Sequence, residues 1–398
     1  MAVDSSLPTY RSTLPIAVDT MGGDLGFEVQ VEGAVQAYHE FGARSILVGP
    51  EDVLRARLEA IGARHLPISV RHASEVITMD DSPAHAVRRK PDASLCVAYR
   101  LVQDGEAAAI LSAGNSGAMM VAGRLICGLL PGIERPAIAA LIPVAGEGNP
   151  NVILDSGANV DCHAQNLVQF AVMGAIYHMS LFNRERPRIA LLSNGTEASK
   201  GTDIIRAASM ILSRMESLNY VGYVEGRDVT TDKADVIVCD GFVGNAILKA
   251  MEGTVRLIFN QLHFESNRGL MRMIGLKLSS GAFKDIFLHK FDYQAHGGAP
   301  LLGLTQLAIV MHGSSDSRAV KSAIRLADSF VTQKMTDKIT AALAQLEEAM
   351  PDIDGDVLSM FTSEKDFRMK RPKKTILRDN VIPEEAEEED ADFKDEGE

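Results

Sequence analysis

The sequence predicts an α/β fold, in which a doubly wound, mostly parallel sheet is arranged as two closely joined lobes. Two observations lead to this prediction. Short runs rich in β-branched residues alternate with helix-length amphipathic stretches, which is the pattern of a parallel sheet covered by helices. The chain has 398 residues, of which 46% are hydrophobic, so it can bury a large core.

Each strand is expected where a short apolar run is bounded by turn residues. These runs are residues 16–18, 45–48, 68–72, 108–112, 137–143, 152–154, 188–192, 220–224, 235–239 and 308–311. Helices are expected where apolar residues recur at helical spacing, at residues 27–41, 116–130, 163–182, 202–218, 243–262 and 316–348. Ten strands exceed one simple dinucleotide-binding unit, which is why we expect two lobes.

Charge divides the chain into a body and a tail. Residues 351–398 carry 8 basic and 16 acidic side chains and so account for −8 of the formal net charge of −13. Such a segment is too charged to pack, and we expect a disordered acidic tail at residues 348–398. It follows an α/β body at residues 15–347, and residues 1–14 are expected to form a poorly ordered leader.

Composition argues against several classes of protein. The negative net charge disfavours binding to nucleic acid. No apolar run approaches the roughly 20 residues that span a bilayer, and the N-terminus lacks the features of a signal peptide, so a cytoplasmic location is expected. The cysteines stand far apart without a C-x-x-C pair, and we expect core thiols instead of disulfides or a zinc site at Cys96, Cys127, Cys162 and Cys239.

Five strand-to-helix junctions are rich in Gly, Asn, Ser and Asp. They lie at residues 19–24, 112–117, 155–159, 193–201 and 240–245. In open parallel sheets the ligand crevice lies at the carboxyl ends of the strands, so we expect these loops to gather at one edge and form the active site. A single loop of this kind is more often an ordinary tight turn, but five in one chain favour a binding site.

Small residues and helix N-termini suit a tetrahedral anion, and phosphate is the natural candidate. The loop residues assigned to it are Gly22, Gly23, Asp24, Gly114, Ser116, Gly117, Asn159, Gly195, Thr196, Asp240 and Asn245. The fourth loop is not a Walker A motif, because Lys200 precedes Gly201, and no junction reads G-x-G-x-x-G. Lys200 is either a phosphate ligand or a solvated surface residue.

A further polar motif, His312-Gly313-Ser314-Ser315-Asp316, follows the last predicted strand. Ser315 or Asp316 is expected to cap the final helix. His312 is a candidate base or phosphate ligand, with a structural histidine as the alternative, and Ser314 and Ser315 are candidate phosphate contacts.

Residues 266–291 are apolar, basic and poor in acidic residues, and Ser279-Ser280-Gly281 interrupts them. We expect a basic amphipathic helical hairpin that contacts a membrane or a carrier protein, with a dimer interface as the alternative. The contact residues are Arg268, Leu270, Arg272, Met273, Ile274, Lys277, Leu278, Phe283 and Lys284.

Taken together, seven motifs resemble those of the phosphate acyltransferase (PlsX) family, over residues 15–347. They are V-D-x-M-G-G-D at 18–24, A-G-N-S-G-A at 113–118, D-S-G-A-N at 155–159, S-N-G-x-E-x-x-K-G at 193–201, C-D-G-F-V-G-N at 239–245, G-G-A-x-L-x-G at 297–303 and H-G-S-S-D at 312–316. Thr20, Leu25, Gly26 and the acidic tail depart from the family pattern.

The resemblance implies a homodimeric enzyme that transfers a fatty acyl group from acyl carrier protein to inorganic phosphate, without a metal or organic cofactor. It implies a fold similar to phosphotransacetylases and to the isocitrate and isopropylmalate dehydrogenases. A membrane glycerol-3-phosphate acyltransferase would receive the acyl phosphate. Delivery to a membrane enzyme would explain why the hairpin contacts the membrane peripherally. The alternatives are a metal- and nicotinamide-dependent hydroxyacid dehydrogenase and a non-catalytic membrane scaffold.

The expected chemistry is direct attack of phosphate on the thioester carbonyl, without an acyl-enzyme. In this hypothesis Lys200 and the loop from Asn194 to Thr196 bind phosphate, while Asn115 and Ser116 face the carbonyl. Asp240 and Asn245 close the site, and His312 orients phosphate or takes a proton.

Overall fold

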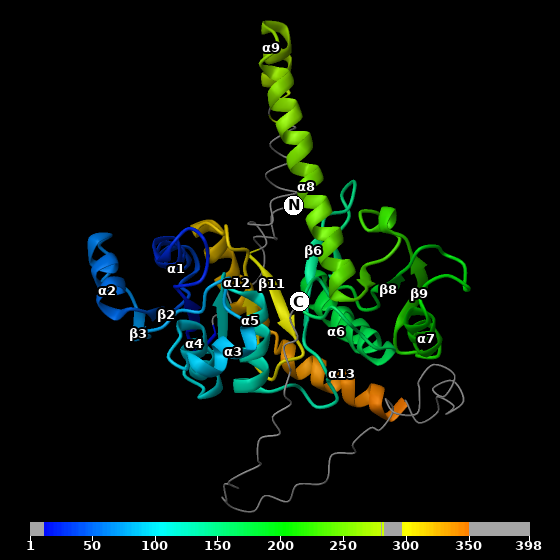
Figure 1. Ribbon diagram of the computed structural model, residues 1–398, viewed down its shortest axis with the longest axis horizontal. Helices are drawn as coiled ribbons and strands as arrows, with labels where there is room; N and C mark the ends of the chain where they lie inside the picture. Colours follow the sequence, from blue (N-terminus) through cyan, green and yellow to red (C-terminus); the bar gives the residue numbers. More distant parts are fainter. Residues whose placement is uncertain (1–11, 280, 282–296, 350–398) are drawn as a thin grey trace, which may run out of the picture. The chain divides into compact units, whose positions relative to one another are not determined.

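A computed structural model of the chain describes residues 12–279, 281 and 297–349 and contains two β-sheets with helices around them (Figure 1). Most of the predicted leader and tail, at residues 1–11 and 350–398, lies outside the described residues, as do Phe283 and Lys284. The α/β class and the mostly parallel strand direction are confirmed.

The first sheet has seven strands in the order β3-β2-β1-β4-β12-β11-β5. Its first five strands run parallel, whereas β11 is antiparallel to both β12 and β5. The strands are β1 (Ile16–Asp19), β2 (Ser45–Gly49), β3 (Ile68–His72), β4 (Ala109–Ser112), β5 (Ala137–Ile138), β11 (Ala299–Leu302) and β12 (Leu307–Val310).

The second sheet has five strands in the order β6-β7-β10-β8-β9. Only β6 is antiparallel to its neighbour. The strands are β6 (Ala140–Ile142), β7 (Asn151–Leu154), β8 (Arg188–Leu192), β9 (Asn219–Val224) and β10 (Val236–Val238).

Two details of the predicted sheet are wrong. The single strand expected at residues 137–143 is divided at Ala139 into β5 and β6, which belong to different sheets. The strand β11 was not predicted, because its glycine-rich surroundings and Pro300 are typical of a turn. The carbonyl of Pro300 accepts a hydrogen bond from the Ala139 N–H (3.0 Å), so β11 lies beside the point where the chain changes sheets.

The helices pack around the two sheets, except for one long helix, most of which projects away from them, and a short helix at its far end (Figure 1). They are α1 (Phe27–Phe41), α2 (Glu51–Ala60), α3 (Pro83–Arg89), α4 (Ser94–Gln103), α5 (Ser116–Ala122), α6 (Ala164–Phe182), α7 (Asp203–Leu212), α8 (Gly241–Ser266), α9 (Leu270–Leu278), α12 (Ser317–Thr332) and α13 (Met335–Ala349). A π-helical turn, Gly123–Cys127, continues α5. The long helix expected at residues 316–348 breaks at Lys334, whose φ of 52° is left-handed.

One hydrophobic core joins the two sheets. It includes Leu47 of the first sheet, Val152 of the second, and Phe170 and Tyr177 of α6, all fully buried. The ring of Tyr177 meets Phe330 of α12 edge to face, with centroids 5.5 Å apart. The four cysteines are also free and buried, so the prediction of core thiols is confirmed.

Candidate active site

Three polar loops meet at the carboxyl edge of the first sheet, after β1, β4 and β12. The Asp24 N–H donates to the Gly313 carbonyl (2.7 Å), which joins the first loop to the third. A Cβ atom on Gly22 would lie 2.6 Å from the Gly114 nitrogen, so only glycine allows the first and second loops to approach this closely. The structure therefore brings together the motifs at residues 18–24, 113–118 and 312–316.

The buried carboxylate of Asp19 organises this edge. It accepts hydrogen bonds from the hydroxyls of Ser94 (2.6 Å) and Ser112 (2.7 Å) and from the Met21 N–H (3.2 Å). Burial raises the pKa of Asp19, and these hydrogen bonds offset part of the rise. Sequence reasoning did not select Asp19, although a carboxylate at the end of an apolar strand and next to a glycine turn was a visible signal.

A second group of loops lies at the carboxyl edge of the other sheet, after β7 and β10. Both oxygens of the fully buried Asp155 accept N–H groups, from Ile138, Gly157 and Ala158 on one side and from the backbone and side chain of Asn159 on the other. Burial raises the pKa of Asp155, against the effect of these donors. Asp155 is the second organising carboxylate that was missed.

The start of α8 packs directly onto this loop. The Gly241 N–H donates to the Asn159 carbonyl (2.7 Å), and a Cβ atom on Gly244 would overlap the Asp155 carbonyl oxygen. Asp240 caps α8 by accepting the Val243 N–H (2.8 Å), and Asn245 is exposed beside Gly157. The predicted loops therefore divide between the edges of two sheets, where one edge was expected.

Two predicted asparagines use their side chains within the protein. The Asn159 amide donates to the Pro136 carbonyl (2.7 Å) as well as to Asp155. The Asn115 oxygen caps α5 by accepting the Ala118 N–H (3.0 Å), and its nitrogen donates to the Thr78 carbonyl (3.2 Å). Both side chains are buried, so each holds a loop in place.

The loop after β8 carries Lys200. The Asn194 side-chain oxygen accepts the Gly201 N–H (2.9 Å) and so closes the loop. The stem of Lys200 lies over Gly195, where a Cβ atom would be 2.8 Å from the Lys200 Cγ, and Thr196 is exposed nearby in the loop. Lys200 is exposed and forms no ion pair within the described residues, which leaves its ammonium group available to an anion.

His312 is exposed at the edge of the first sheet. Its Nδ1 accepts the Ser314 N–H (3.2 Å) and lies 2.8 Å from the Ser314 hydroxyl. The neutral ring therefore carries its proton on Nε2. Ser315 is buried, and Asp316 is the residue that caps α12 by accepting the N–H groups of Arg318 and Ala319.

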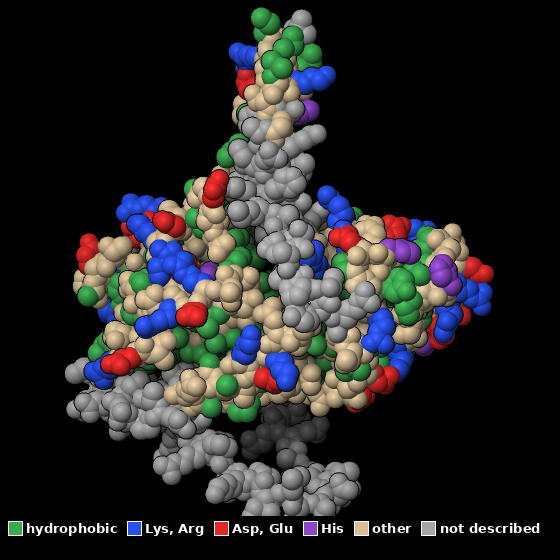
Figure 2. Space-filling view, turned by 180° about the vertical axis from the view of Figure 1, so that it is seen from behind, with side chains coloured by type: hydrophobic (Ala, Val, Ile, Leu, Met, Phe, Trp, Pro, Cys, Tyr) green, Lys and Arg blue, Asp and Glu red, His purple; other side chains and the backbone are tan. Residues whose placement is uncertain are grey.

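The predicted hairpin begins with the last turn of α8 and with α9. Arg268 and Arg272 both pair with Glu265. The side chains of Met271 and Leu278 are more than four-fifths exposed, and Met273, Ile274 and Lys277 are also exposed. Figure 2 shows hydrophobic and basic side chains side by side at the α9 end.

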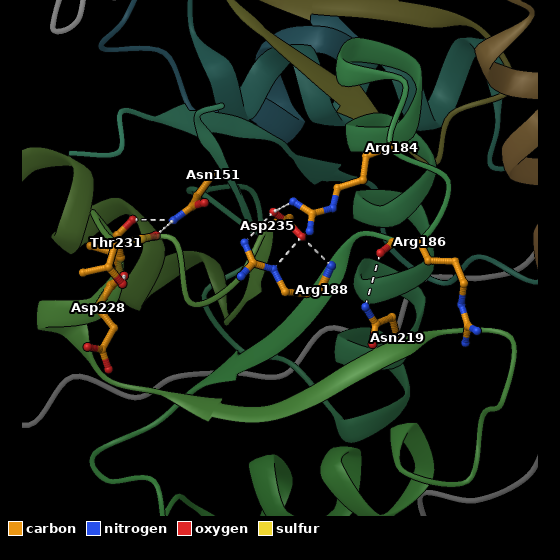
Figure 3. A network of polar contacts seen from close by, with 9 residues as sticks. Asn151, Arg184, Arg186, Arg188, Asn219, Asp228, Thr231 and Asp235 are labelled. Atoms are coloured by element: carbon orange, nitrogen blue, oxygen red, sulfur yellow. Dashed lines mark hydrogen bonds and ion pairs between the residues drawn. The ribbon is translucent and has the colours of Figure 1, made fainter. Parts of the chain in front are cut away.

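A different charged cluster lies at the amino edge of the second sheet (Figure 3). The carboxylate of Asp235, 7% exposed, pairs with Arg184 (2.9 Å) and with Arg188 (3.0 Å). Burial opposes the ionisation of Asp235, but the hydrogen bonds and charges of the two arginines outweigh it and lower its pKa. Because this cluster is remote from the carboxyl edge, we assign it to stability.

Two features of the described residues concern metal binding and the crossing of a membrane. No three His, Cys, Asp or Glu side chains in this part of the chain are grouped so that they could hold a metal ion. None of the helices in the described ranges has the length and apolar character that crossing a membrane requires.

The similarity of this sequence to known proteins shows which family the chain belongs to. The sequence model of the family described as "Fatty acid synthesis protein" matches residues 14–338. A phosphate acyltransferase of Syntrophotalea carbinolica is 45% identical over 343 residues, covering 86% of this chain and 97% of the relative. This chain belongs to the phosphate acyltransferase family. A second family member, from Trichlorobacter lovleyi, is 46% identical over 330 residues, covering 83% of this chain and 94% of the relative.

Solved structures support the fold of this phosphate acyltransferase family member. A phosphotransacetylase from Streptococcus pyogenes superimposes with a TM-score of 0.57 at 20% identity, covering 82% of this chain and 96% of that one. EutD phosphotransacetylase from Staphylococcus aureus gives a TM-score of 0.50 at 15% identity, covering 80% and 94%. The expected likeness to phosphotransacetylases is confirmed, and the dehydrogenase alternative is not favoured.

Proposed function

We propose that this protein transfers a fatty acyl group from an acyl carrier protein thioester to inorganic phosphate and so makes acyl phosphate for phospholipid synthesis. The observation that carries the proposal is the position of the family motifs. Six of the seven lie in loops at the carboxyl edges of two sheets, in a chain 45% identical to a phosphate acyltransferase. Carboxyl edges of this kind are where α/β folds bind ligands.

The chemistry makes modest demands on side chains. Phosphate is largely dianionic near neutral pH, since phosphomonoesters have a second pKa of about 6. A thiol with a pKa of roughly 8.5 leaves readily, so strong general-acid help is unnecessary. A phosphate oxygen adds to the carbonyl carbon, and the carbonyl oxygen becomes an oxyanion. The tetrahedral adduct then collapses, the carbon–sulfur bond breaks, and the thiolate departs. The protein must therefore hold the anion and stabilise the tetrahedral oxyanion.

The proposed roles follow from charge and exposure. Lys200 and the loop from Asn194 to Thr196 bind phosphate. This role is supported by the exposed Lys200 side chain, which has no ion-pair partner in the part of the chain that the structure describes. The glycine-rich loops around Gly22 and Gly114, with Ser116, supply backbone N–H groups to the oxyanion. The other proposed phosphate contacts are Gly23, Asp24, Gly117, Asp240, Asn245, His312 and Ser314. Asn159 and Ser315, which were also predicted to contact phosphate, are buried and are not proposed as contacts.

The proposed partners rest on exposed apolar surface. Leu257, Phe259 and Phe264 of α8 are all more than half exposed, which suits burial against a second copy of the chain. The apolar and basic α9 suits peripheral membrane contact, where a membrane glycerol-3-phosphate acyltransferase would receive the product. We therefore propose a cytoplasmic protein that forms a dimer through α8 and contacts the membrane peripherally through α9.

The test measures acyl phosphate and free thiol together, with long-chain acyl carrier protein and phosphate as substrates. Equal, phosphate-dependent formation of both products is expected. Thiol release without acyl phosphate would identify a hydrolase, and no release would favour the scaffold alternative.

Replacing Lys200 tests the phosphate site. We expect Lys200→Ala to raise the KM for phosphate at least tenfold, because a hydrogen bond to a charged group contributes roughly 1.5–3 kcal/mol. Lys338→Ala, at an exposed lysine on α13, is the matched control and should leave KM unchanged. Normal phosphate KM and kcat in Lys200→Ala would remove Lys200 from the site.

A further inference from the structure

Three arginines without partners among the described residues lie toward the ends of two adjoining helical segments. Arg88 and Arg89 end α3, and Arg124 follows α5 in the π-helical turn. All three are exposed, and none forms an ion pair or a side-chain hydrogen bond within the described residues. Most other arginines in the same part of the chain do have such partners; Arg268 and Arg272, for example, share Glu265.

These helices begin at the candidate site. The helix α5 starts directly after the loop that contains Gly114, and α3 starts after the loop 78–82. Asn115 ties that loop to the start of α5. The two helices then pack together at their beginnings, where a Cβ atom on Gly117 would lie 2.9 Å from the Pro83 Cγ.

Exposed apolar side chains accompany the arginines. Leu125, next to Arg124, is 54% exposed, and Met79 in the loop held by Asn115 is 65% exposed. The loop itself is fixed, because Lys90 pairs with Asp81 (2.6 Å) and donates to the Val76 carbonyl (3.0 Å). A preformed surface with free arginines and a few apolar contacts is suited to an acidic protein partner.

We infer that this α3–α5 face, defined by Arg88, Arg89, Arg124, Leu125 and Met79, is where the acyl carrier protein docks through acidic side chains. The inference rests on the proposed function and goes beyond it by separating two surfaces. The α3–α5 face binds the carrier, whereas α9, which exposes apolar side chains and whose Arg272 already pairs with Glu265, is left to the membrane. A carrier seated here places its thioester arm beside the loops from which both helices begin.

The test compares charge-reversal variants on two substrates. Arg88→Glu, Arg89→Glu and Arg124→Glu, singly and combined, are assayed with acyl carrier protein and with acyl-pantetheine, which lacks the carrier. The matched control is Arg214→Glu, at an exposed and equally unpartnered arginine after α7. We expect the combined variant to raise the KM for acyl carrier protein at least tenfold and to lose most of its salt dependence. Turnover of acyl-pantetheine should be unchanged.

Three other results overturn the inference. The first is an unchanged KM for the carrier in the combined variant, and the second is an equal loss of activity with both substrates. The third is a normal carrier KM together with lost binding to anionic phospholipid vesicles, which would assign the face to the membrane. Titrating each variant with the carrier protein measures docking without turnover. If the wild type bound the carrier through these arginines but formed no acyl phosphate, the proposed function would fail and the docking site would stand.

Discussion

At the scale of a single residue, Asn115 forms hydrogen bonds with both the oxygen and the nitrogen of its side-chain amide, and the two roles can be tested separately. Asn115→Ser keeps an oxygen that can cap α5 but removes the donor to the Thr78 carbonyl. We expect faster amide hydrogen exchange in residues 78–81 with α5 unchanged, and a higher KM for the acyl substrate. Asn115→Ala should also weaken α5, by about 1 kcal/mol. Identical exchange in the wild type and Asn115→Ser would show that the loop does not depend on this hydrogen bond.

The same residue shows what a sequence can reveal about a site. The loop that contains Asn115 was identified from its glycines and polar residues, but the direction of its side chain depends on the loop 78–82, which is distant in sequence. Asp19 and Asp155 were missed for a related reason. Their importance comes from donors such as Ser94 and Ile138, and only the folded chain brings these donors to the carboxylates.

At the scale of an element, the amino end of β10 depends on Asp235. Removing its charge leaves Arg184 and Arg188 without their buried partner, so Asp235→Asn should lower the free energy of unfolding by about 3 kcal/mol. Urea denaturation measures this change. Asp203→Asn is the control, because the Asp203 side chain is 77% exposed in its pair with Arg206 and should contribute less than about 1 kcal/mol. Equal effects of the two substitutions would contradict the assignment of the Asp235 cluster to stability.

Helices and strands differ in how far the sequence predicted them. The bounds of α1 agree with the prediction, because its apolar residues recur at helical spacing and Gly42 ends it in a left-handed conformation. The helix α4 was missed because eight of its ten residues are buried, so it lacks the polar face that reveals a surface helix. The division of residues 137–143 between two sheets depends on the pairing of β5 with β11 and of β6 with β7. No local sequence pattern indicates this pairing.

At the scale of the whole molecule, His178 links stability to pH. Its ring is buried in α6, neither ring nitrogen has a hydrogen-bond partner among the described residues, and burial lowers its pKa to about 4, with smaller effects of Asp235, Arg184 and Arg188. The unfolded chain, with a histidine pKa near 6.5, takes up a proton between about pH 6.5 and pH 4 that the folded chain does not. Stability should therefore fall with falling pH across this window, by up to about 3 kcal/mol.

Urea denaturation between pH 7 and pH 5 measures this dependence. We expect the free energy of unfolding of His178→Phe to depend less on pH than that of the wild type, because the phenylalanine ring cannot take up a proton. His65→Gln, at an exposed histidine, should retain the wild-type dependence. The same pH dependence in His178→Phe and the wild type would show that other groups cause it.

The division of the chain at Ala139 has a mechanical consequence. Enzymes with two lobes often close over a ligand by rotating about a connecting segment whose backbone torsions are free to change. Here a single residue separates β5 from β6, its N–H is bonded to Pro300, and the neighbouring Ile138 is bonded to both Asp155 and Ser156. Rotation at this connection would break the hydrogen bonds that Ala139 forms with β11 and that Ile138 forms with the loop after β7. The connection is a rigid joint, and adjustment to a bound ligand belongs to the loops that surround it.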